Sequence, residues 1–140
     1  MSAPNKLHSI MLIDDNEIDN LINQKMIESA AISQHILVHT GARSALEFLR
    51  NIEKLSGTVA DASKLIPELI LLDIDMPMMD GFQFLEEFER FSDSIKDATK
   101  IIMLTSSMNP NDLGRAKKSK YVAKYLNKPL GFDNLLTLNA

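Results

Sequence analysis

The chain has 140 residues, the usual size of one domain, and 45% of them are hydrophobic, which is enough for a packed core. Its net charge of −4 argues against nucleic-acid binding, and its lack of cysteine excludes disulfides and zinc–thiolate sites. No apolar stretch approaches the roughly 18 residues of a membrane span, and residues 1–6 lack the apolar core of a signal peptide. We therefore expect a cytoplasmic protein with no membrane insertion and no nucleic-acid partner.

The first half of the chain predicts two strand–helix pairs. An apolar run at 9–13 predicts a strand, and a helix over 17–29 is predicted by four apolar residues at helical spacing that form one face: Ile18, Leu21, Ile22 and Met26. A second run at 36–39 precedes a helix that begins at Ala42 and extends to about Leu55, before the typical stop Ser56-Gly57. Residues 57–67 show no periodicity and are expected to form a surface connection.

The second half predicts three more pairs. A run at 69–72 predicts the third strand, and Asp80-Gly81 opens a helix lined by Phe84, Leu85, Phe88 and Phe91. The fourth strand, at 101–104, precedes a helix opened by Asn109-Pro110-Asn111, since proline is favoured at the first helical position. A strand at 125–127 and a short helix at 132–136 complete the chain.

This fivefold alternation of strand and helix predicts an α/β fold with a parallel sheet and helices on both faces. For five units we expect a doubly wound, flavodoxin-like (βα)5 sheet with strand order 2-1-3-4-5.

Polar side chains follow four of the strands, at the edge of the sheet where ligands bind in such folds. They are Asp14 and Asp15, Asp73, Thr105 and Lys128. Neighbouring carboxylates repel each other unless a cation lies between them, and Mg²⁺ prefers such oxygen ligands. Asp73 is central and can act as a nucleophile that forms an aspartyl-phosphate, while a hydroxyl and an ammonium can stabilise the phosphoryl oxygens.

These motifs resemble the receiver domain of two-component response regulators, the CheY-like family, over roughly residues 7–138. The matching segments are Ile13-Asp14-Asp15, Leu71-Leu72-Asp73-Ile74-Asp75-Met76-Pro77, Met79-Asp80-Gly81, Met103-Leu104-Thr105-Ser106 and Tyr125-Leu126-Asn127-Lys128-Pro129. The resemblance implies a receiver domain over 7–140, preceded by a tail at 1–6. It implies that Asp73 accepts a phosphoryl group from a histidine kinase or a histidine phosphotransfer protein.

The resemblance also implies a role for each residue around Asp73. Mg²⁺ is held by Asp14, Asp15, Asp73 and the backbone carbonyl of Asp75. Thr105 and Lys128 bind the phosphoryl group, Thr105 and Tyr125 form the switch, and the Lys128–Pro129 bond is often cis in this family. Asp75 and Ser107 flank the path of the attacking water, and we expect them to tune the phosphoryl lifetime.

We expect a stand-alone regulator that is not an enzyme, since only eleven residues follow Pro129. It would signal by protein contact, through the fourth helix, the fifth strand and the last helix, or by passing the phosphoryl group onward. The basic residues Arg115, Lys117, Lys118, Lys120 and Lys124 form a solvated face or attract an acidic partner.

Other interpretations remain open from the residues alone. Asp14-Asp15-Asn16 is also typical of a helix N-cap, and Tyr125 of a half-buried strand. Asp73-Ile74-Asp75 resembles the Asp-x-Asp motif of haloacid-dehalogenase-type phosphatases, although there the motif usually follows the first strand. A receiver-like interaction module that is never phosphorylated is the other alternative; its hallmark would be a missing acceptor, acid pair or lysine.

Overall fold

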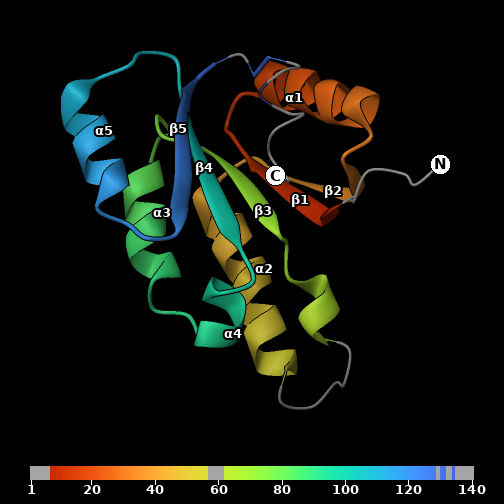
Figure 1. Cartoon of the computed structure of the whole chain (residues 1–140). Helices are drawn as coiled ribbons and strands as arrows, with labels where there is room; N and C mark the ends of the chain where they lie inside the picture. The colour runs from red at the N-terminus through yellow and green to blue at the C-terminus, as the bar shows by residue number, and fades with distance from the viewer. Residues whose placement is uncertain (1–6, 57–61, 129, 132–133, 135–140) are drawn as a thin grey trace.

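The computed structural model describes residues 7–56, 62–128, 130, 131 and 134. Its centre is one sheet of five parallel strands in the order β2-β1-β3-β4-β5 (Figure 1). The strands are β1 (Leu7–Ile13), β2 (Ser33–His39), β3 (Leu69–Asp73), β4 (Lys100–Thr105) and β5 (Val122–Asn127). The predicted doubly wound order is therefore confirmed, and all five strands are longer than the apolar runs that predicted them.

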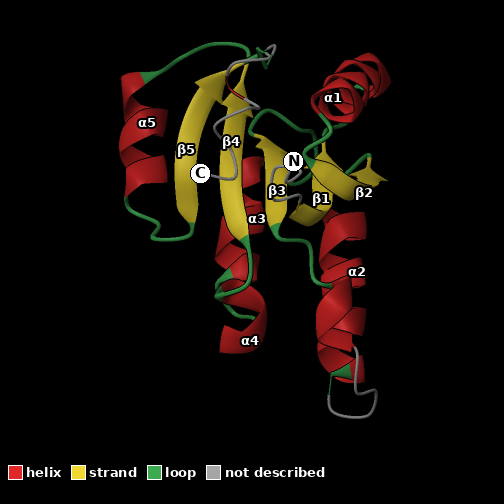
Figure 2. Ribbon diagram, turned by 45° about the vertical axis from the view of Figure 1, so that its right-hand side comes forward, coloured by secondary structure: helices red, strands yellow, loops and turns green. Residues whose placement is uncertain are grey.

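Five α-helices connect these strands in the described part of the chain (Figure 2). They are α1 (Glu17–Ala30), α2 (Ala42–Leu55), α3 (Gly81–Phe88), α4 (Asp93–Lys96) and α5 (Pro110–Lys117). The helix predicted fourth is α5, because the short α4 was not predicted, and the helix predicted at 132–136 falls outside the described residues except for Asn134. None of the described helices is long and apolar enough to cross a membrane.

The core lies on both faces of the sheet, because side chains alternate along each strand. Met11 and Ile13 belong to the larger cluster, which contains the buried residues of α2, α3 and α5, with Phe84 and Phe88 fully buried. Ile10 and Leu12 belong to the cluster on the opposite face, which α1 covers. β3 is buried along its whole length, so its last residue projects from a rigid part of the sheet.

The predicted apolar face of α1 is wrong for three of its four residues: the helix is present and Met26 packs against the core, but the other three residues face solvent. Ile18, Leu21 and Ile22 are 68%, 54% and 44% exposed, and the buried residues are Asn20, Asn23 and Ile27. The Asn20 side-chain amide donates a hydrogen bond of 2.8 Å to the Asp14 carbonyl, which turns the polar side of the helix toward the end of β1. The buried side of the helix therefore combines this polar contact with the apolar contacts of Ile27 and Met26.

The predicted surface connection at 57–67 is only partly correct. Residues 57–61 are outside the described part, and a 3₁₀ helix, η1 (Ala62–Leu65), follows them. Ala62, Ile66 and Pro67 are buried, so the end of this connection contributes to the core instead of running over the surface.

Candidate functional site

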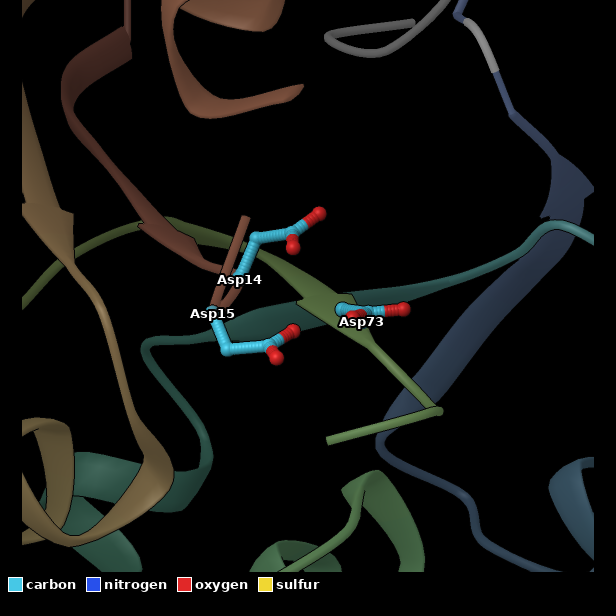
Figure 3. Close-up of side chains that lie close together, drawn as sticks. All are labelled: Asp14, Asp15 and Asp73. Atoms are coloured by element: carbon cyan, nitrogen blue, oxygen red, sulfur yellow. The ribbon is translucent and has the colours of Figure 1, made fainter. Parts of the chain in front are cut away.

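Three carboxylates lie together at the carboxyl ends of β1 and β3. Asp14 and Asp15 follow β1, Asp73 ends β3, and the two strands are adjacent, with Ile13 paired to Leu72. Carboxylate oxygens of the three residues lie within 4.8 Å of one another, and Figure 3 shows the side chains extending into the same space. Asp14 and Asp73 are buried, whereas Asp15 is exposed and open to a ligand from solvent.

The ammonium group of Lys128 is bound to this cluster from the end of β5. The backbone N–H of Lys128 donates to the Thr105 carbonyl at 2.8 Å, and this hydrogen bond holds Lys128 beside β4. Its Nζ lies 2.6 Å from Asp14 Oδ2, 3.2 Å from Asp73 Oδ1 and 3.1 Å from Asp19 Oδ2. Asp19 was not identified from the sequence; its only signal is its position in the first turn of α1, which any helix-capping acid would share.

The charges in this crevice shift the pKa values of two groups. Burial and the charge of Asp14 raise the pKa of Asp73 to about 6, against the opposing effect of Lys128. Burial lowers the pKa of Lys128, but its hydrogen bonds to Asp14 and Asp19 outweigh this and raise the pKa above its usual value. The ammonium group therefore stays charged, and it alone cannot balance the carboxylates around it.

The donor set fits a hard divalent cation such as Mg²⁺. The clustered groups offer carboxylate oxygens, which are the ligands that Mg²⁺ selects. They offer neither sulfur nor imidazole nitrogen, which softer metals prefer. The excess of negative charge in a buried crevice is a second reason, since a cation at this point reduces the repulsion between the carboxylates.

Thr105 is the last residue of β4, which is adjacent to β3. The residue is buried, and its hydroxyl donates to the Ser107 carbonyl at 3.0 Å and accepts from the Ser107 N–H at 3.1 Å. The hydroxyl is thus held by the loop that follows β4.

A family model described as the response regulator receiver domain matches residues 10–139. The chain belongs to this family. It is 30% identical over 126 residues to the probable methanogenesis regulatory protein FilR2 of Methanothrix harundinacea, covering 90% of this chain and 75% of that protein. It is 26% identical to the response regulator Rcp1 of Synechocystis, covering 92% and 82%. A two-component response regulator from Cytophaga hutchinsonii has a similar structure, with a TM-score of 0.83, 28% identity and 96% of each chain covered.

Receiver domains are in general signalling modules and not classical enzymes, and they bind Mg²⁺ at an acidic pocket like the one formed by Asp14, Asp15 and Asp73. Membership of the family therefore argues against the haloacid-dehalogenase-type interpretation of Asp73-Ile74-Asp75.

Tyr125 of this receiver lies on β5, paired with Met103 of β4. The residue is half-buried, and its hydroxyl oxygen is fully buried with no hydrogen-bond partner among the described residues. The ring therefore has its polar end in an unfavourable position, and the switch role of Tyr125 stays a prediction.

The other predicted site residues, Asp75 and Ser107, contact Asp73 and Thr105 through their backbones. Asp75 is exposed, and its backbone N–H donates a 3.3 Å hydrogen bond to the Asp73 carboxylate. Ser107 is exposed and contacts Thr105 through its backbone. The effects of Asp75 and Ser107 on phosphoryl lifetime and the metal contact of the Asp75 carbonyl stay predictions, and the Lys128–Pro129 bond includes a residue outside the described part.

Asp80-Gly81 begins α3 as predicted. Asp80 caps the helix through the Gln83 N–H, and the Gln83 side chain accepts from the Asp80 N–H, each at 2.9 Å. A Cβ at Gly81 would lie 3.0 Å from both the Asp73 carbonyl oxygen and Ile74 Cα, which are backbone atoms. Glycine therefore lets α3 begin directly against the residue that carries the central carboxylate.

Proposed function

We propose that this receiver accepts a phosphoryl group on Asp73 from the phosphohistidine of a histidine kinase or a histidine phosphotransfer protein, with Mg²⁺ bound. It then signals by phosphorylation-dependent contact with another protein. One observation carries the proposal: a buried carboxylate at the end of the central strand lies beside a pair of carboxylates, and an ammonium group lies 3.2 Å from it.

The chemistry needs an ionised nucleophile, and a pKa of about 6 leaves Asp73 mostly ionised at neutral pH. A carboxylate oxygen attacks phosphorus, the phosphorus–nitrogen bond to the donor imidazole breaks, and the electron pair remains on the imidazole nitrogen. Mg²⁺ held by Asp14, Asp15, Asp73 and the Asp75 carbonyl would neutralise charge on the phosphoryl oxygens. Lys128 already contacts Asp73, so a small movement of its flexible side chain brings the ammonium to a phosphoryl oxygen.

The phosphoryl group adds nearly two negative charges and strong hydrogen-bond acceptors next to Thr105. We propose that the Thr105 hydroxyl leaves Ser107 to donate to it, and that Tyr125 moves into the space that opens. Such a change would reach the surface between α5 and β5, where a groove is lined mainly by apolar groups: Leu113, Ala116, Lys117, Val122, Ala123, Lys124, Tyr125 and Leu126. This groove, with the helix expected from the sequence at 132–136, is the proposed contact surface for a downstream target.

The test is intact-mass analysis after incubation with acetyl phosphate, with and without Mg²⁺. We expect one added phosphoryl group that requires Mg²⁺ and is lost in Asp73→Asn. Asp75→Asn is the matched control, because it removes a nearby exposed carboxylate and leaves the acceptor. Its adduct should form, whatever its lifetime.

Two outcomes would overturn the proposal. A chain that binds Mg²⁺ in calorimetry but forms no adduct would be a phosphorylation-independent interaction module. Rapid, continuous release of phosphate from an aryl phosphate would identify a phosphatase. Transfer of the phosphoryl group from a phosphorylated histidine phosphotransfer protein to Asp73 would support the proposed class of donor.

A further inference from the structure

Asp19 is a third partner of the Lys128 ammonium group and belongs to neither the acid pair nor the acceptor. Its Oδ2 lies 3.1 Å from Nζ, across a sequence separation of 109 residues. We propose that Asp19 is a positioning residue, which holds Lys128 beside Asp73 when Asp14 and Asp73 are engaged with a cation and a phosphoryl group. This inference rests on the proposed function, because it assigns Asp19 a role in the same reaction.

The position of Asp19 is determined by contacts with the acidic crevice itself. The Asn16 side chain caps α1 by accepting from the Ile18 and Asp19 N–H groups at 2.9 and 3.0 Å. The Asn16 N–H in turn donates to Asp14 Oδ1 at 2.9 Å. Asp19 is therefore held at a defined place relative to Asp14, one helical turn from the cap.

An acid in the first turn of a helix is also common without any such role, because it interacts favourably with the helix dipole. Glu17 provides that comparison on the same turn: it is exposed, and no contact joins it to Lys128 in the described structure. Asp19 differs in its ion pair with Lys128, whose side chain is only 15% exposed, while the Asp19 side chain is 36% exposed. Partial burial keeps water from replacing this pair easily.

The number of donors explains why a third carboxylate matters. A lysine ammonium has three N–H donors, and here it has three carboxylate neighbours, Asp14, Asp19 and Asp73. Asp14 and Asp73 have other roles in the proposed reaction, so their oxygens are not reserved for Lys128. The Asp19 carboxylate remains a partner of the ammonium group throughout the proposed reaction. It thereby limits how far the flexible Lys128 side chain can move from Asp73.

The first experiment compares the rate of phosphorylation of the full chain by acetyl phosphate in Asp19→Asn and Glu17→Gln. Acetyl phosphate is an anion, so the loss of a negative charge alone should make both variants slightly faster. We expect Asp19→Asn to be several-fold slower, Glu17→Gln not to be slower, and Asp19→Glu to recover part of the rate. In a Lys128→Met background, Asp19→Asn should cause no further loss. A faster Asp19→Asn, or a loss of the same size without Lys128, would overturn the proposal.

The second experiment observes the ammonium directly by NMR of lysine labelled with ¹⁵N, with Lys128→Met to assign the signal. With Mg²⁺ bound, we expect hydrogen exchange of the Lys128 Nζ protons to be several-fold faster in Asp19→Asn and unchanged in Glu17→Gln. Unchanged exchange in a folded Asp19→Asn chain would contradict the proposal. This measurement needs no phosphoryl group, so it tests the role of Asp19 independently of the proposed function. Failure of the proposed function would instead appear as the absence of a phosphoryl adduct in the unaltered chain.

Discussion

Thr105 and Ser107 form a closed pair of hydrogen bonds at the end of β4. The Thr105 hydroxyl donates to the Ser107 carbonyl at 3.0 Å and accepts from the Ser107 N–H at 3.1 Å. A hydroxyl that moves to a phosphoryl group on Asp73 must give up its present acceptor. The loop after β4 would then be released, and this would connect the proposed chemistry at β3 to the start of α5.

Thr105→Val keeps the shape of the side chain and removes both hydrogen bonds. We expect it to lower the free energy of unfolding by about 0.5–1.5 kcal/mol, since the Ser107 N–H and carbonyl lose their partner but belong to an exposed residue, and Thr105→Ser to restore most of the loss. Urea denaturation measures both variants. Hydrogen exchange of the Ser107 amide should be faster in Thr105→Val, and an unchanged rate would show that the Thr105 hydroxyl does not hold this loop.

Tyr125→Phe removes a buried hydroxyl that has no partner among the described residues. An unpaired buried hydroxyl costs free energy, so we expect the unphosphorylated chain to keep its stability or gain up to about 1 kcal/mol, measured by urea denaturation. A clear loss of stability would reveal a hydrogen bond that holds the ring inward and would argue against its proposed movement.

The raised pKa of Asp73 predicts a pH-dependent stability in the absence of Mg²⁺. Because burial and Asp14 raise the pKa from its usual acidic range to about 6, the folded chain binds more protons than the unfolded chain between these values. The stabilising contribution of protonated Asp73 is present at low pH and is lost as the pH rises through about 6. Asparagine does not ionise, so the Asp73→Asn variant does not lose stability in this way. We therefore expect the substitution to stabilise the chain more at pH 7.5 than at pH 5, two pH values that lie roughly one unit or more from the Asp73 pKa.

Urea denaturation at both pH values measures this difference, and an equal effect at the two would contradict the raised pKa. Added Mg²⁺ provides the control, because a cation held by the same carboxylates should raise the stability of the unaltered chain at neutral pH more than that of Asp73→Asn.

Gly81→Ala and Gly114→Ala form a matched pair of helical substitutions. A Cβ at Gly81 would lie 3.0 Å from backbone atoms of Asp73 and Ile74, so we expect a loss of about 1–3 kcal/mol and displacement of the acceptor. Nothing lies within 4 Å of a Cβ at Gly114, so alanine there should stabilise α5 by about 0.5–1 kcal/mol. Thermal or urea denaturation distinguishes them, and equal effects would show that α3 does not need the close approach.

The exposed face of α1 predicts unequal costs for two aliphatic truncations on that helix. Ile27 is 1% exposed, so Ile27→Ala should cost about 2–5 kcal/mol in the free energy of unfolding. Leu21 is 54% exposed, and Leu21→Ala should change stability by less than about 1 kcal/mol. A large loss in Leu21→Ala would mean that another part of the chain covers this face.

The strands and the residues of the crevice could be predicted from the sequence, whereas the strand order was expected from the usual topology of a doubly wound fold with five units. Short buried runs and helical periodicity are local signals, and parallel strands of a doubly wound sheet bring their carboxyl ends to one edge. Asp14, Asp15, Asp73 and Lys128 could therefore be placed in one crevice before any coordinates. The start of α3 at Asp80-Gly81 was equally visible, because capping residues act within one turn.

The pairing of these groups and the direction in which α1 faces depend on contacts between segments far apart in the chain. Ile18, Leu21 and Ile22 are exposed, whereas α1 faces the protein with Asn20, which bonds to the Asp14 carbonyl, and with Ile27, which is buried in the core. The ion pair of Asp19 with Lys128 follows from this orientation of the helix. It joins residues 109 positions apart, and no local pattern encodes a distance between side chains that meet only after the sheet has formed.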